Sequence, residues 1–435
     1  MELSRRQLLV AGGIAGAGTF GTGYWQRRRL VRFSTIRELR EIIAIDVPQI
    51  AADSIITMPL LESAHGRATD RFNDIEARID PSSDHPSDAL VANLREQLTE
   101  TAPERVAVWP HGTPAIHYAR RQALFTYRRI RSRIISVLAN VAPEELPSDA
   151  FDEQMTDARE QRTSMTVPYQ GRTLGEATVA SSLIESTLSN ADGHLENAEE
   201  EDDSTERWGN LERATAAIED GAAFIDGRDG TNLNTTLSTL AERLVTEYEQ
   251  RIENAPDPLI EGVTHDDAPV SSFANSAVGA LQRSMRDLGA AHYFRRGLLD
   301  DGAYGRAAHI HALLLPTVPL YETFAEVPRV PYWEELAYDR GATPTELGAE
   351  KAATIDTLEP YLASNDPLVT HLAAVPLGVV RRTDNRLQTL IDDARTLTDP
   401  EWRRRHDQAL LQYEGARNYA ESIEDTLEII REVER

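Results

Sequence analysis

The spacing of apolar residues between positions 174 and 254 constrains the fold of this chain more than any other feature. They recur at steps of three and four in two runs, Ile184, Leu188, Ala191, Leu195 and Ala198, then Leu211, Ala214, Ile218, Ala222 and Ile225. A third run follows, Leu233, Leu237, Leu240, Leu244, Tyr248 and Ile252. Such steps place a stripe of apolar side chains along one face of a helix. We predict three amphipathic helices, at 174–200, 205–225 and 231–254.

The short connections between these helices make neighbours antiparallel, which favours an up-and-down bundle. A coiled coil that pairs two chains is the alternative, and packing within one chain is simpler. Elsewhere few runs alternate as strands do. The remaining predicted helices span 34–45, 50–79 with a break at Pro59, 88–101, 115–139, 271–299, 303–315, 345–362, 367–397 with an interruption at Pro376, and 400–433. The predicted class is all-α, an antiparallel up-and-down helical bundle or irregular helical array with an N-terminal signal or anchor helix.

A proline-rich break at 255–270 is the clearest boundary between domains. We therefore predict four parts: an N-terminal signal or anchor at 1–30, a helical bundle at 31–254, this linker, and a C-terminal helical domain at 271–435.

The charge of the chain indicates its habitat. It has 71 acidic residues against 45 lysines and arginines, a formal net charge of −26, and Lys351 is the sole lysine. This composition resembles that of haloarchaeal proteins, whose self-repulsion is screened in molar salt, where the Debye length falls to about 3 Å. The absence of cysteine excludes disulfides, thiol-bound metals and a cysteine-linked lipid anchor.

The first thirty residues predict the compartment. Ser4-Arg5-Arg6-Gln7-Leu8-Leu9 precedes a glycine-rich apolar segment, and it resembles a twin-arginine export signal with Arg5 and Arg6 as its motif. The resemblance implies export in the folded state. If uncleaved, residues 8–25 are long enough to act as a membrane anchor. We expect the main domain to lie outside the cell membrane. By the positive-inside rule, the arginines at 27–29 favour the alternative, in which the main domain lies on the cytoplasmic face.

The predicted helix at 115–139 carries six arginines and no acidic residue. On a helical wheel Arg131 falls in the apolar sector with Leu124, Tyr127, Ile134 and Leu138, so it requires a carboxylate partner. The other five form a candidate face for an anionic partner: Arg120, Arg121, Arg128, Arg129 and Arg133. Packing against an acidic helix of the same chain is the simpler alternative.

Signatures of catalysis, nucleotide binding and metal binding are missing, so we assign no catalytic residue, metal site or cofactor. His309 and His311 lie two residues apart on a predicted helix, where their side chains point in different directions and cannot share an ion. The aromatic residues Tyr332, Trp333 and Tyr338 of a proline-rich segment are candidates for a ligand cleft or for burial between helices.

These features predict a non-enzymatic helical scaffold or binding protein of the haloarchaeal cell envelope, exported or membrane-anchored. Its partners would be the membrane, through residues 8–25, and another protein; no nucleic acid is expected. An exported hydrolase, with a site assembled from distant Asp, Glu and His residues, is one alternative. A membrane-tethered regulator that faces the cytoplasm is the other.

Overall fold

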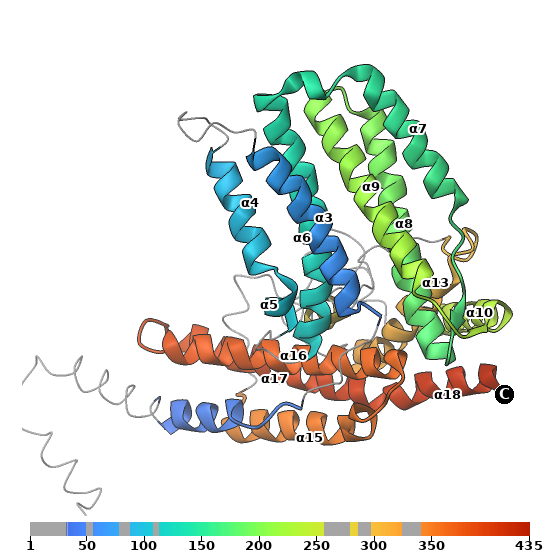
Figure 1. The fold of residues 1–435 in the computed structure, drawn as a ribbon. Helices are drawn as coiled ribbons and strands as arrows, with labels where there is room; N and C mark the ends of the chain where they lie inside the picture. Colours follow the sequence, from blue (N-terminus) through green and yellow to red (C-terminus); the bar gives the residue numbers. More distant parts are fainter. Residues whose placement is uncertain are drawn as a thin grey trace, which may run out of the picture.

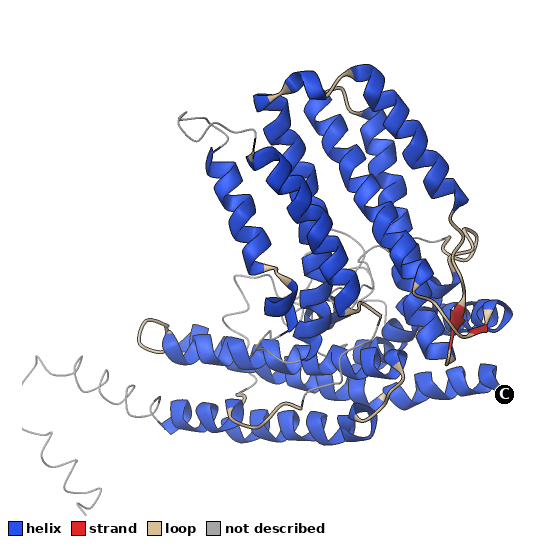
Figure 2. Cartoon of the chain, viewed as in Figure 1, coloured by secondary structure: helices blue, strands red, loops and turns tan. Residues whose placement is uncertain are grey.

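The chain folds into helices, as the apolar spacing predicts (Figure 2). The computed structural model describes Arg32 and residues 34–48, 55–77, 88–107, 113–255, 279–285, 297–323 and 341–435. The signal motif Arg5 and Arg6, the segment 8–25 and the residues Tyr332, Trp333 and Tyr338 lie outside these ranges. Within them, no helix is long and apolar enough to cross a membrane.

The helices form two groups. In the first, α3 (Met58–Glu76), α4 (Asp88–Glu100), α6 (Thr113–Val141), α7 (Ser148–Ser164), α8 (Leu174–Glu200) and α9 (Ser204–Asp226) run side by side. They stand at a steep angle on a second group that contains α15 (Pro344–Leu362), α16 (Pro367–Asp392) and α17 (Asp399–Glu421) (Figure 1). The short elements α5 (Pro103–Ala107) and η1 (Pro143–Glu145) flank α6, whereas α10 (Asn234–Glu253), α13 (Tyr304–Leu314), η2 (Leu315–Thr317), α14 (Val318–Thr323) and α18 (Ile423–Glu434) join the second group.

Helix α8 connects the two groups. Its first turns place Leu174, Val179 and Ala180 in the core of the second group, and its later turns place Ile184 and Leu188 in the core of the first. No other helix in the described ranges contributes buried residues to both cores. The N-terminus of α8 is fixed by Thr173, whose hydroxyl accepts a hydrogen bond of 3.0 Å from the backbone N–H of Glu176.

Helix α10 departs from the predicted bundle. Helices α8 and α9 pair as expected, but α10 packs against α13 and α18 in the other core. A two-residue antiparallel ribbon explains the turn, because β2 (Thr231–Asn232) pairs with β1 (Gln170–Gly171) and returns the chain to the start of α8. Gly230 permits the close approach with a φ of +112°, and a Cβ atom there would lie 2.6 Å from the Gly171 carbonyl.

The position of α10 bears on the predicted domains. It precedes the predicted linker at 255–270, yet it shares a core with the helices that follow. Of this linker the structure describes only Ala255. The division of the chain at the linker therefore stays a prediction.

Several observed helices differ from the predicted ones, and two of the differences have a local reason at a proline. Pro59 stands in the first turn of α3, where its missing N–H is not needed, so the helix begins there instead of breaking. Helix α16 continues through Pro376, which lies inside a fully buried stretch where packing outweighs the lost hydrogen bond. The last predicted helix is divided at Ser422 into α17 and α18.

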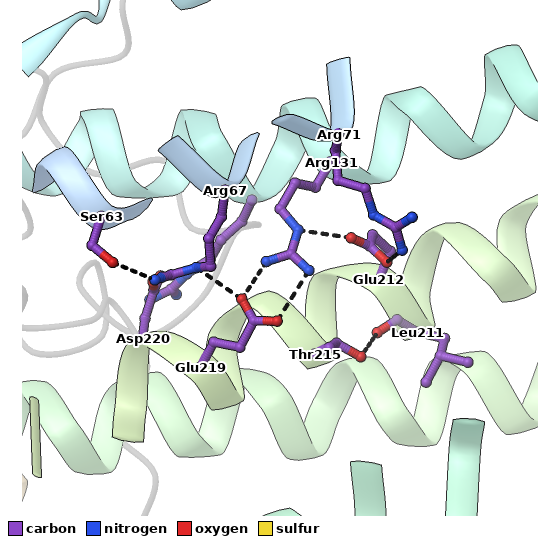
Figure 3. A network of polar contacts seen from close by, with 10 residues as sticks. Ser63, Arg67, Arg71, Arg131, Leu211, Glu212, Thr215, Glu219 and Asp220 are labelled. Atoms are coloured by element: carbon purple, nitrogen blue, oxygen red, sulfur yellow. Dashed lines mark hydrogen bonds and ion pairs between the residues drawn. The ribbon is translucent and has the colours of Figure 1, made fainter. Parts of the chain in front are cut away.

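Arg131 of α6 lies in the core of the first group, as its wheel position predicted, and it has the carboxylates it requires (Figure 3). Its Nε donates to Glu212 of α9 at 2.7 Å, and its two terminal nitrogens bind Glu219 at 2.5 and 3.3 Å. Burial by itself would lower the pKa of this guanidinium, but the charges of Glu212 and Glu219 outweigh burial and raise it.

The network extends to α3, so that charged side chains join three helices. Arg67 of α3 binds Glu219 at 2.9 Å and Asp220 at 2.8 Å, and Arg128 of α6 reaches the other oxygen of Asp220 at 2.7 Å. Asp220 is only 3% exposed. The Arg128–Asp220 pair is enclosed on both sides, so salt screens it much less than it screens a surface pair.

We predict that Arg131→Leu lowers the free energy of unfolding by about 3–5 kcal/mol, because Glu212 would keep its burial and lose its closest partner. Arg133→Leu on the same helix is the control. It should change stability by less than about 0.5 kcal/mol, since the nearby charge of Arg213 repels Arg133. Urea denaturation in molar salt measures both. Equal losses in the two variants would contradict the assignment.

Candidate functional site

A groove of about 550 Å³ lies between the end of α7, the middle of α8 and the start of α13. It combines segments from distant parts of the sequence: residues 162–169, residues 185–196 and residues 298–306. Its volume falls within the range of small-molecule sites, about 300–1,000 Å³. We refer to it as the α8 groove.

The buried carboxyl group of Glu185 forms the floor of the α8 groove. One oxygen accepts a hydrogen bond of 3.1 Å from the backbone N–H of Gly305, and the other accepts one of 2.5 Å from the N–H of Arg306. Both donors belong to the first turn of α13, so Glu185 caps that helix from α8. The cap requires Gly305, because a Cβ atom there would lie 2.0 Å from the hydroxyl oxygen of Ser181.

Burial raises the pKa of Glu185 to about 7, although hydrogen bonds from the backbone N–H groups of Arg306 and Gly305, and the nearby hydroxyl of Tyr169, oppose the shift. Tyr169 is itself held in place, since its hydroxyl donates to the carbonyl of Gly302 at 2.6 Å. The floor of the groove therefore carries a carboxyl group that changes its protonation state near neutral pH.

The wall and rim of the groove combine charge with apolar surface. Arg162 of α7 binds Asp192 of α8 at 2.6 Å across the rim, and the Nε of Arg162 has no hydrogen-bond partner among the described residues. Leu188 and Leu298 supply apolar surface. Such a surface can hold a small polar compound that also has an apolar part.

Gly193 lies in the C-terminal third of α8 and lines the same groove. A Cβ atom at this position would meet no atom within 4 Å. Glycine inside a helix costs about 0.5–1 kcal/mol relative to alanine, and no close approach of another element requires it here. Its effect is to leave the groove wider.

The arginines predicted as a face for an anionic partner have several partners within the chain. Arg120 donates to the Ile56 carbonyl at 2.8 Å, and Arg129 donates to the Gln97 side chain at 3.2 Å. Arg128 belongs to the network of Asp220 described above. Burial lowers the pKa of Arg213 on α9, and the charges of Arg133 and Arg129 lower it further. Arg121 is part-buried. An external anionic partner for these arginines stays a prediction.

His309 and His311 contact different residues, as their spacing predicted. His309 lies in the core between two polar side chains. Its Nδ1 is 3.1 Å from the hydroxyl oxygen of Ser182, and its Nε2 is 3.0 Å from the Nδ1 of His371. His311 contacts the Ala307 carbonyl at 2.8 Å. Within the described ranges, no group of three or more His, Asp or Glu side chains is placed to hold a metal ion.

Comparison with family models, curated proteins and solved structures finds no match to this chain. The α8 groove therefore has to be interpreted from its own residues. None of its floor residues was among the predicted site residues. The one signal in the sequence is Glu185 itself, a carboxyl group inside a run of small and apolar residues from 177 to 188.

The raised pKa of Glu185 predicts a specific dependence of stability on pH. The folded state holds the proton more tightly than the unfolded chain, whose ordinary pKa is 4.5. Stability should therefore fall as the pH rises from about 4.5 to about 7, by at most about 3 kcal/mol.

The measurement is urea denaturation across this pH range for wild type and Glu185→Gln, which cannot titrate. The free energy of unfolding of the wild type, relative to that of Glu185→Gln, should fall as the pH rises from about 4.5 to about 7. Glu196→Gln, an exposed position on the same helix, should keep the wild-type profile. A constant difference between wild type and Glu185→Gln would refute the assigned pKa.

Proposed function

We propose that this protein is a non-enzymatic binding protein of the cell envelope that takes a small polar ligand in the α8 groove. The observation that carries the proposal is the groove itself, with a buried carboxyl group at its floor and an open glycine position in its wall. The ligand would contact Glu185 and Arg306 at the floor and the Arg162–Asp192 pair at the rim.

The proposed placement in the envelope rests on the twin-arginine resemblance of residues 4–9 and on the apolar segment 8–25. The high negative charge supports a habitat of high salt. In this proposal the N-terminal segment holds the helical body at the outer face of the membrane.

One observation favours the second candidate, an exported hydrolase. A carboxyl group with a pKa of about 7 matches the requirement for a general acid or base at neutral pH. Glu185 would fill this role, and the groove includes residues from both halves of the chain. Its hydrogen bonds to the first turn of α13 supply a structural reason for the same carboxyl group, so we prefer the binding function.

The groove is tested with Gly193→Phe, which fills the open space, and Gly193→Ala as the matched control. We expect some members of a panel of sugars, amines, amino acids and carboxylates to raise the melting temperature of the wild type in molar salt. That rise should disappear in Gly193→Phe and persist in Gly193→Ala, because only the larger side chain occupies the groove.

An equal rise in the wild type and Gly193→Phe would place the ligand elsewhere. If no compound in the panel raises the melting temperature of the wild type, the proposed ligand class is wrong. Conversion of a bound compound to product, lost in Glu185→Gln, would establish the hydrolase instead.

Protease treatment of intact cells in native salt tests the location. The body should be cleaved in wild-type cells and protected in cells that carry Arg5→Lys and Arg6→Lys, because the paired arginines are the recognition element of such signals. Protection in both strains would place the body in the cytoplasm. That result would support the alternative of a membrane-tethered regulator that faces the cytoplasm. Membrane fractionation shows whether residues 8–25 remain attached.

A further inference from the structure

The N-terminal strap, defined as Arg32 with residues 34–48, lies along the C-terminal helices (Figure 1). Residues 34–43 are helical, and the apolar side chains of Leu39 and Ile42 are buried in the same core as α15, α16 and α17. A Cβ atom on Gly348 of α15 would lie 3.4 Å from the Cγ1 of Ile42, so the two helices are in close contact.

Lys351 of α15 fastens the C-terminal end of the helix in this strap, at residues 42 and 43. Its ammonium group donates to the carbonyls of Ile42 and Ile43 at 2.9 and 3.3 Å and to Asp384 of α16 at 2.9 Å. These contacts use all three of its donors. Both carbonyls lie in the last turn of the strap helix, where a cation is favourable, and the Ile42 carbonyl also accepts a hydrogen bond of 3.1 Å from the N–H of Ile45.

The neighbours of Lys351 connect this point to α17. The second oxygen of Asp384 accepts a hydrogen bond of 2.5 Å from the hydroxyl of Tyr413. Lys351 is 0% exposed, and it is the one lysine of the chain. The strap, α15, α16 and α17 thus meet at a single buried ion pair.

Arginines fasten the strap at its two ends. Arg32 donates to the carbonyls of Ala394 and Leu397 at 2.6 and 3.0 Å and binds Asp399 at 2.5 Å, which attaches it to the turn between α16 and α17. At the other end, Arg381 of α16 donates to the carbonyl of Pro48 at 2.9 Å. A passive linker would not need contacts of this kind along its length.

We propose that the N-terminal strap is a latch: it closes on the C-terminal helices through Lys351, Arg32 and Arg381, and it opens as a unit while the rest of the body stays folded. The closed latch fixes the place where the preceding segment joins the body, at the turn between α16 and α17. Helices α7 and α13, which line the α8 groove, lie far from that turn (Figure 1). An anchored N-terminus would therefore hold the groove away from the point of attachment.

The latch is tested by acylating the full-length protein with an N-hydroxysuccinimide ester and following residue 351 by mass spectrometry. In wild type, Lys351 should react at least about 100-fold more slowly than a free lysine derivative, because it is reached only when the latch opens. Arg32→Ala combined with Arg381→Gln should accelerate the reaction about tenfold or more, since each change removes hydrogen bonds that hold the strap closed.

Arg243→Ala is the matched control, because its partner Glu432 lies 3.8 Å away and both side chains are exposed; its rate should stay within about twofold of wild type. Two results would overturn the latch. One is a wild-type Lys351 as reactive as the free derivative. The other is an acceleration in the double variant that equals its increase in global unfolding, measured by tryptophan fluorescence.

A disulfide supplies the reciprocal test, because the chain has no cysteine of its own. Ile42→Cys with Gly348→Cys, added to the Arg32 and Arg381 changes, should restore slow acylation when oxidised and lose it on reduction. If the oxidised protein still reacts rapidly, Lys351 is exposed by some other motion and the latch is wrong. This proposal does not depend on the ligand or on the location of the protein.

Discussion

The rest of the structure depends on the packing of α8 inside two cores at once. Its first half is buried on nearly all sides, and small residues such as Ala177, Ser181 and Ser182 let neighbouring helices approach it. The second group of helices meets the first around this segment, and α13 comes close enough for its N-terminus to be capped by Glu185. The α8 groove thus forms because one helix is buried in both cores.

Much of the helical fold could be predicted from the sequence, because amphipathic spacing is a local property. The predicted helix at 174–200 matches α8, and Leu237, Leu240, Leu244 and Tyr248 of the third apolar run are buried in α10. Arg131 could be identified as buried from its wheel position alone. The sequence does not show which acidic residues pair with Arg131, because that pairing depends on how α6, α9 and α3 are arranged.

The candidate site was not predictable because it forms only in three dimensions. Glu185 and Arg306 are 121 positions apart, and no spacing rule relates them. The partner of α10 was mispredicted for the same reason. Its stripe shows which face is buried, whereas the ribbon between residues 170–171 and 231–232 determines which core receives it.

The hydrogen-bonded series Ser182, His309 and His371 joins α8, α13 and α16 in the core. Where two imidazole nitrogens face each other at 3.0 Å, only one of them carries a hydrogen. When both rings are neutral, the choice at that contact sets the tautomer of each ring and, through His309, the direction of the Ser182 hydroxyl. Reversing one donor requires reversing the others, so three helices share a single ordered direction of hydrogen bonding.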